Sequence, residues 1–189
     1  GTRVRAAAAG IRAMEIESVT DVVPAYTTIA VYFDSARISP DGIADTIASV
    51  VNANASLVAG SSAIVEIPVR YDGPDLDDVA ERTGLTVRDV IARHSSRTYR
   101  AYMSGFVPGF AYLGDLDPLL VVARRSVPRV RVPAGSVAIA AAQTAVYPLE
   151  TPGGWHLIGS TTLRMFDAAC NPPALIRAGD TVRFIPTAA

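Results

Sequence analysis

The sequence predicts an α+β protein in which a lobe of helices and strands is followed by a small β-barrel or β-sandwich. Three patterns indicate this class. Helical periodicity and β-branched runs alternate up to residue 70, a short all-helical stretch follows to residue 96, and short β-type runs separated by Gly and Pro fill the rest. The chain has 189 residues, of which 50% are hydrophobic, so it is long enough to bury a core.

The first lobe opens with an Ala-rich amphipathic helix. Val4, Ala7, Ala8 and Ile11 fall at positions i, i+3, i+4 and i+7, which predicts a helix over residues 3–14. Two runs rich in β-branched and aromatic residues follow, with a proline between them where a strand must pause. These runs predict strands over residues 16–23 and 28–33.

A second helix and a third strand complete the lobe. Ser39 is a suitable N-cap with Pro40 at the first helical position, and the apolar periodicity ends near Asn52. Alternation of apolar residues then predicts a strand over residues 64–70. This order of elements is that of a ferredoxin-like split βαβ unit without its first strand, so we expect a ferredoxin-like lobe over residues 1–70.

Residues 71–96 are predicted to form a helical connector. A helix that begins near Leu76 ends at Gly84, and Thr86 with Asp89 forms the capping box of a second helix. Two short helices around a glycine turn also resemble a DNA-binding helix-turn-helix, but their many acidic residues would face phosphates unfavourably.

Residues 97–189 are predicted to form a small barrel or sandwich domain. The expected strands cover residues 98–103, 130–133, 136–140, 145–147, 155–159 and 181–185.

Composition excludes several classes of function. The formal net charge is −1, which argues against electrostatic binding of nucleic acid, and no apolar run approaches the length of a membrane span. All 17 basic residues are Arg, so the chain has no lysine for a Schiff base, a P-loop or a Ser-Lys nucleophile. Cys170 is the single cysteine, which excludes an internal disulfide. We expect a cytoplasmic protein with no membrane association.

Three segments of the second half could carry a ligand site. Residues 105–114 alternate glycines with aromatics, including Phe110 and Tyr112, and could form one wall of a site or a barrel corner packed on itself. Arg129 and Arg131, at a spacing of two on a predicted strand, could jointly hold a carboxylate or phosphate, or could form a solvated face.

The third segment runs from Gln143 to Trp155. Its Gln143 and Tyr147 could orient an amide, and Trp155 could contact the ligand. Glu150 is the one carboxylate between residues 118 and 153, so it is a candidate base or a partner for an Arg.

The two histidines are weaker candidates. His94 lies on an apolar helix face near a C-terminus, where it could act as a base but would more often be structural. His156 has no His or Cys at ligand spacing, so no metal site is expected.

The motifs of these segments resemble a known family. The runs "GFVPGFAYLGDLD", "RRSVPRVRVPAGSVAIAAAQTAVYPLETPGGWHLIG" and "IPVRYDGPDLDDVAERTGL" are similar to proteins labelled allophanate hydrolase subunit 1, or the KipI family, which includes the B component of bacterial 5-oxoprolinase. The resemblance implies a ferredoxin-like lobe followed by a cyclophilin-like β-barrel.

The resemblance also implies a function in a complex. Members pair with a subunit 2 protein (KipA-like, or the C component of 5-oxoprolinase), alongside a third, LamB/YcsF-like subunit, in the ATP-dependent opening of a cyclic amide to glutamate. ATP, with magnesium, would then be used by the assembled complex and not bound by this chain alone. The alternative implied by the KipI name is a regulatory protein that inhibits a sensor histidine kinase.

Overall fold

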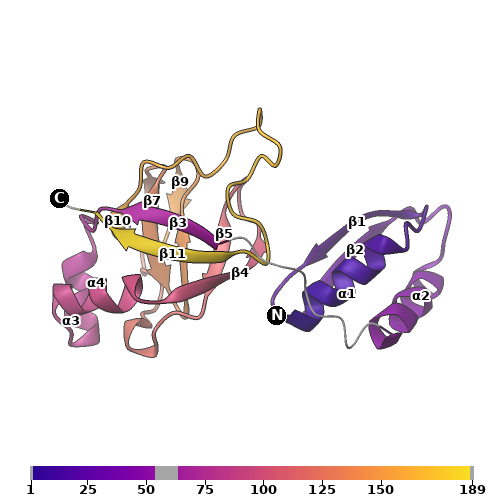
Figure 1. The fold of residues 1–189 in the computed structure, drawn as a ribbon, viewed down its shortest axis with the longest axis horizontal. Helices are drawn as coiled ribbons and strands as arrows, with labels where there is room; N and C mark the ends of the chain where they lie inside the picture. Colours follow the sequence, from indigo (N-terminus) through magenta and orange to yellow (C-terminus); the bar gives the residue numbers. More distant parts are fainter. Residues whose placement is uncertain (1, 54–63, 188–189) are drawn as a thin grey trace. The chain divides into compact units, whose positions relative to one another are not determined.

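The computed structural model describes residues 2–53 and 64–187, which belong to two compact units, Gly1–Ser61 and Ser62–Ala189. Figure 1 shows their elements. Helices and strands both contribute, which confirms the predicted α+β class. Among the described residues, no helix has the length and apolarity needed to cross a membrane.

The first unit is a β-hairpin packed against helices. Its elements are α1 (Thr2–Ala13), β1 (Val19–Pro24), β2 (Ile29–Phe33) and α2 (Pro40–Ala53), in the predicted order. The two strands pair antiparallel, and their buried faces meet α1 around Ala8, Ile11 and Val22. Ser39 caps α2 as expected, because its Oγ accepts a hydrogen bond from the Gly42 amide at 3.1 Å.

The strand predicted to complete this lobe belongs instead to the second unit. This strand, β3 (Ile64–Val69), pairs in parallel with the C-terminal strand β11 (Thr181–Pro186). Its Ile67 and Val69 side chains are fully buried in the barrel core. The boundary between the units therefore lies at residues 61/62 and not at residue 70, and the described part of the first unit has only two strands.

The second unit is a barrel of seven strands in the order β10-β7-β8-β5-β4-β11-β3. The remaining strands are β4 (Thr98–Ser104), β5 (Ala111–Gly114), β7 (Ser136–Ala140), β8 (Gln143–Val146) and β10 (His156–Ser160). An antiparallel bridge between Arg70 and Ser160 joins the two edges. Their amides and carbonyls exchange hydrogen bonds of 2.9 and 2.8 Å, so the sheet closes into a barrel, one of the two arrangements that the strand pattern allows.

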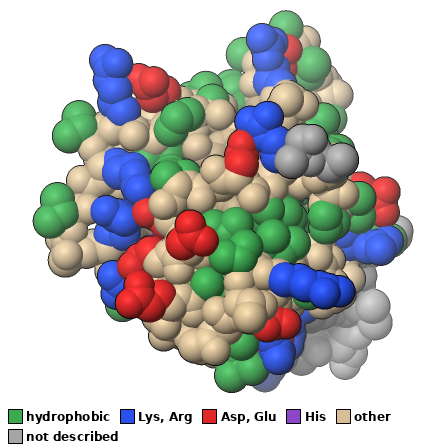
Figure 2. Space-filling model, turned by 90° about the vertical axis from the view of Figure 1, so that its left-hand side faces the viewer, with side chains coloured by type: hydrophobic (Ala, Val, Ile, Leu, Met, Phe, Trp, Pro, Cys, Tyr) green, Lys and Arg blue, Asp and Glu red, His purple; other side chains and the backbone are tan. Residues whose placement is uncertain are grey.

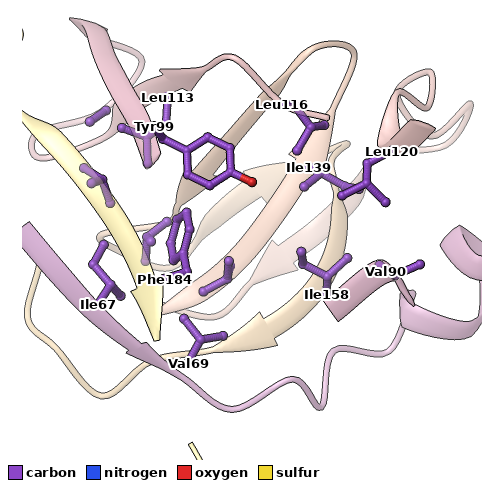
Figure 3. Close-up of a cluster of buried hydrophobic side chains, with 14 of the residues drawn as sticks. Ile67, Val69, Val90, Tyr99, Leu113, Leu116, Leu120, Ile139, Ile158 and Phe184 are labelled. Carbon is purple, nitrogen blue, oxygen red and sulfur yellow. The ribbon is translucent and has the colours of Figure 1, made fainter. Parts of the chain in front are cut away.

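The barrel interior forms the main core. Figure 3 shows its aliphatic and aromatic side chains converging from several strands, among them Tyr99, Leu113, Ile139 and Phe184. Successive side chains of a strand point to opposite faces of the sheet, so every second side chain lies inside the barrel. This explains the alternating pattern of apolar residues in these strands.

Two helices cover one end of the barrel. They are α3 (Leu76–Thr83) and α4 (Val87–Ser95). Gly84 ends α3 with a φ of 68°, and Thr86 and Asp89 form the predicted capping box of α4. Because Val79 and Val90 are fully buried in the barrel core, these helices are part of the second unit, whereas the sequence suggested a separate connector.

A second cluster of buried side chains lies on the outer face of the sheet. All five residues of β7 are buried, because Val137 and Ile139 face the interior cluster while Ala138 and Ala140 face the outer one. A ribbon of two short strands, β6 (Arg129–Val132) and β9 (Thr151–Gly153), contributes Val132 to the outer cluster. The sequence predicts neither β5 nor β9, which are short and rich in Gly or Pro.

Candidate functional site

The outer cluster is built around the single tryptophan. The ring of Trp155 has its centroid 5.7 Å from that of Phe110 and 6.0 Å from that of Tyr112, both edge-to-face. Tyr147 contacts Phe110 in the same way at 5.4 Å. We call Phe110, Tyr112, Tyr147 and Trp155 the aromatic cluster. The structure thus brings together the four aromatic residues that the sequence proposes for substrate binding.

A strained loop supports this cluster. Residues 105–110 form a tight turn in which the Gly105 amide donates to the Phe110 carbonyl at 3.1 Å. Phe106 has a φ of 74° and Gly109 a φ of 81°. A bulky residue rarely adopts a positive φ, and such strain gathers at functional sites. Phe106 is 59% exposed and contacts Phe110 edge-to-face, so the loop presents an aromatic ring to solvent beside the cluster.

Arg124 supplies positive charge next to the aromatic cluster. Its guanidinium carbon lies 5.9 Å from the centroid of the Trp155 ring, within the range of a cation–π interaction. The side chain is exposed, and within the described residues it has no carboxylate partner. A weakly hydrated, unpaired guanidinium beside aromatic faces is suited to hold a small carboxylate.

Tyr147 is a hydrogen-bonding group in the same cluster. Burial raises the pKa of its phenol, although the hydrogen bond from the Trp155 amide and the charge of Arg124 oppose this. The hydroxyl therefore keeps its proton at neutral pH. Gln143 lies at the other end of β8, about 13 Å along the strand at 3.3 Å per residue, so it is not part of this cluster.

The two predicted arginines do not converge on one ligand. Arg129 pairs with Asp75, whereas Arg131 lies 3.5 Å from Glu150 with both side chains largely exposed. The cause is a bulge in the ribbon. Arg129 is opposite Gly153 and Val132 is opposite Thr151, so an extra residue breaks the alternation that would have placed both guanidinium groups on one side. The prediction of a joint arginine site is therefore wrong, and Glu150 lies in an exposed ion pair.

Asp75 holds three segments together: the loop before β6, the start of β6, and β10. Its carboxylate accepts hydrogen bonds from Arg125 at 2.7 Å, from Arg129 at 2.8 and 2.7 Å, and from the Leu157 amide at 2.7 Å. Burial acts to raise its pKa, but the hydrogen bonds from Arg129 and Leu157 and the charges of both arginines outweigh it and hold the pKa below its ordinary value. Asp75 is 3% exposed, so it is a positioning residue that fixes the segment following Arg124.

His94 lies inside the barrel and not in the candidate site. It is fully buried, and its Nδ1 and Nε2 are 2.8 Å from the Tyr71 hydroxyl and 2.9 Å from Thr144 Oγ1. Because Thr144 donates to the Ala138 carbonyl, its oxygen accepts from Nε2, and Nδ1 accepts from Tyr71. Burial lowers the pKa of His94 to about 3. These contacts give His94 a structural role, which corrects its nomination as a catalytic residue.

Several charged side chains elsewhere form ion pairs at the surface. On the face shown in Figure 2, Arg and acidic side chains lie beside one another, with hydrophobic side chains between them. Asp78 and Arg82 on α3 form such a pair at 2.8 Å. Among residues 2–53 and 64–187, no three His, Cys, Asp or Glu side chains are grouped so as to hold a metal ion.

Sequence reasoning missed Arg124 and Asp75. Both lie in the motifs quoted above, but no spacing pattern singles out either residue. The role of each residue comes from a contact with a distant segment of the chain. Arg124 reaches Trp155, and Asp75 reaches the amide of Leu157, 82 residues later.

Comparison with known proteins places the chain in a family. Two curated relatives bear the name of the B component of the enzyme 5-oxoprolinase. The Bacillus subtilis protein is 42% identical over 96% of this chain and 81% of its own length. The Escherichia coli O157:H7 protein is 53% identical over 66% of this chain and 59% of its own length.

A solved structure agrees with this relationship. The crystal structure of TTHA0988 has a TM-score of 0.87 and 38% identity, and the match covers 100% of this chain but only 37% of the other. The family described as "Carboxyltransferase domain, subdomain C and D" matches residues 1–176. The chain belongs to this carboxyltransferase C/D family, and its curated relatives are subunits of 5-oxoprolinase.

Proposed function

We propose that this chain is a non-autonomous subunit of an ATP-dependent hydrolase complex that opens 5-oxoproline, a cyclic amide, to glutamate. The observation that carries the proposal is the 42% identity to a B component of 5-oxoprolinase over 96% of the chain. An enzyme with a B component has further components. We expect a KipA-like partner, equivalent to the C component of 5-oxoprolinase, and a third, LamB/YcsF-like subunit.

The family and the names of the relatives support a role that depends on partners. The family is described as subdomains C and D of a carboxyltransferase domain, and the curated relatives bear the name of one component of an enzyme. The chain spans 59% of the Escherichia coli relative and 37% of the TTHA0988 chain. Substrate contacts from other parts of the assembly would complete the site. A stable interface of this kind buries more than about 1,000 Å².

The aromatic cluster is the proposed binding site for the substrate. 5-Oxoproline is a small ring with one carboxylate and one amide. The Arg124 guanidinium would hold the carboxylate, the half-buried ring of Tyr112 would pack against the substrate ring beside the buried Trp155, and Phe106 would cover it from the strained loop. Small-molecule sites usually combine apolar walls with a few polar groups in this way.

We place ATP and magnesium on another subunit. The chain has no lysine and no glycine-rich phosphate loop with a following Lys-Ser/Thr. Transfer of the ATP γ-phosphoryl group to the amide oxygen would release ADP. Attack of water on the activated carbon would then break the ring C–N bond and leave an acyl phosphate, which a second water would hydrolyse to glutamate and phosphate. Such a route needs no nucleophile from this chain, and its arginine would serve to orient the substrate.

Replacing Arg124 tests the function and the site together. In the assembled complex, Arg124→Ala should lower kcat/KM for 5-oxoproline about a hundredfold, or about 2.7 kcal/mol, because the substrate carboxylate loses its counter-charge. Glutamate formation is the readout. Arg88→Ala, which removes an exposed arginine from α4, is the matched control and should leave the rate unchanged.

The outcomes separate the two parts of the proposal. A wild-type complex that forms no glutamate from 5-oxoproline and ATP would refute the function. A complex that forms glutamate equally fast with Arg124→Ala would refute the site and leave the function standing.

A further inference from the structure

The main chain is held on both sides of Arg124, although the arginine itself is exposed. On one side, the Ala123 carbonyl lies 2.9 Å from Nε2 of His156. On the other side, the Arg125 amide donates to the Gly154 carbonyl at 2.8 Å. These two hydrogen bonds hold the two peptide planes that meet at the Cα atom of Arg124.

Holding both planes sets the direction of the side chain. A residue has only two soft main-chain dihedral angles, φ and ψ, between its flanking peptide planes. With both planes held, the Cα–Cβ bond of Arg124 has one direction, and the guanidinium carbon lies 5.9 Å from the centroid of the Trp155 ring. Trp155 itself lies between the two anchors, Gly154 and His156. We call residues 154–156 the support of Arg124.

His156 contributes its side chain to this support. It is 2% exposed, and Nε2 carries a hydrogen because a carbonyl oxygen can only accept a hydrogen bond. Nε2 keeps this hydrogen whether or not Nδ1, which lies 3.3 Å from Oδ2 of Asp78, also carries one. The bond to the Ala123 carbonyl is therefore present in both charge states of the ring.

An arginine that only solvates the surface needs no such support. Loops are ordinarily more mobile than the elements that they connect, whereas binding groups are held in place by the hydrogen bonds of the residues around them. A guanidinium that is already oriented loses less conformational entropy when it binds a carboxylate. The support therefore favours a ligand-binding role for Arg124.

We propose that His156 is a positioning residue that determines the preference of the site for cyclic amides that carry a carboxylate. Its bond to the Ala123 carbonyl orients Arg124, and Arg124 pairs with the carboxylate, which takes no part in the reaction at the amide. His156 therefore acts on substrate binding and not on the chemical step. This inference rests on the proposed function, which supplies the substrate, but the effect of His156 on Arg124 can be measured without any reaction.

NMR of the full chain tests whether His156 orients Arg124. The ring current of the single tryptophan should shift the side-chain protons of Arg124 upfield, and Arg124→Ala identifies their signals by removing them. We expect the upfield shift to disappear in His156→Leu, which has no donor for the Ala123 carbonyl. The shift should remain in His156→Gln, whose amide nitrogen can take the place of Nε2.

Kinetics of the assembled complex test whether His156 acts on substrate binding. We expect His156→Leu to raise KM for 5-oxoproline about tenfold with kcat unchanged, because orienting Arg124 on binding costs about as much as fixing the main chain of one residue. In the Arg124→Ala background, the same substitution should change KM by less than about twofold, since both residues act on one contact. His156→Gln should restore the wild-type KM.

Thr144→Val is the matched control. It also removes a side-chain donor to a main-chain carbonyl, that of Ala138 at 3.0 Å inside the barrel, and it keeps the shape of the side chain. A loss of folded protein lowers the apparent kcat and leaves KM in place, so Thr144→Val should not change KM. If His156→Leu does not fold, His156→Asn takes its place, because the shorter amide side chain cannot reach the Ala123 carbonyl.

Two results would overturn the proposal. One is an upfield shift of the Arg124 protons that is absent from the wild type, or that survives in a folded variant without the donor at residue 156. The other is a KM that stays at the wild-type value in that variant, or that rises by the same factor in the Arg124→Ala background. A complex that forms no glutamate from 5-oxoproline would refute the proposed function, and the NMR result would still decide whether His156 orients Arg124.

Discussion

Replacing Asp75 with alanine is expected to lower the free energy of unfolding by about 3–5 kcal/mol, the usual cost of removing one partner from a buried ion pair. The substitution leaves two arginines and one backbone amide without their hydrogen-bond acceptor. Arg125 and Arg129, with side chains 32% and 24% exposed, would lose their common acceptor, and the Leu157 amide would lose its partner. Urea unfolding followed by circular dichroism measures the change.

Glu66→Ala is the matched control for this experiment. It removes a carboxylate from an exposed pair with Arg183 at 3.1 Å, in which both side chains are more than half exposed. Such pairs contribute at most about 1 kcal/mol. If Asp75→Ala destabilises the chain no more than Glu66→Ala does, the buried anchor described above does not exist.

Acidification should lower the free energy of unfolding through the buried histidine, and this is the second large effect that we expect. Burial lowers the pKa of His94 from 6.5 to about 3, so the folded state favours the neutral ring. The contribution to stability is therefore complete above pH 6.5 and is lost as the pH falls towards 3. At about 1.4 kcal/mol per pH unit, this group alone should remove about 3 kcal/mol between pH 6.5 and pH 4.

A variant without the ionisable ring isolates this contribution. His94→Gln should be less stable than the wild type at pH 7, because the hydrogen bonds to Tyr71 and Thr144 are replaced imperfectly. It should lose less stability on acidification, by about 3 kcal/mol at pH 4. Parallel pH dependences for the two chains, measured by urea unfolding, would show that His94 does not titrate with a lowered pKa in the folded protein.

Local signals in the sequence predict most of the elements of this fold. Caps such as Ser39 and the Thr86–Asp89 box act within one turn, so they can be read from neighbouring residues. The pairing of β3 could not be predicted in this way. Its alternation indicates a strand, but its partner β11 lies more than 100 residues away, as the Glu66–Arg183 contact across 117 residues shows.

The candidate site could be predicted only in part. Glycines alternating with aromatics marked Phe110 and Tyr112, and these residues do pack with Trp155. The arginine prediction failed because a bulge in β6 changes which way a side chain points without any residue type that marks it. The roles of Arg124 and Asp75 depend on tertiary contacts alone.

Glutamate formation from 5-oxoproline and ATP should be measured in three mixtures: this chain with its partner subunits, the partners without this chain, and this chain alone. We expect glutamate only from the complete mixture. Turnover by this chain alone, or an unchanged rate when it is left out, would show that the chain is not an obligatory, non-autonomous subunit of the enzyme.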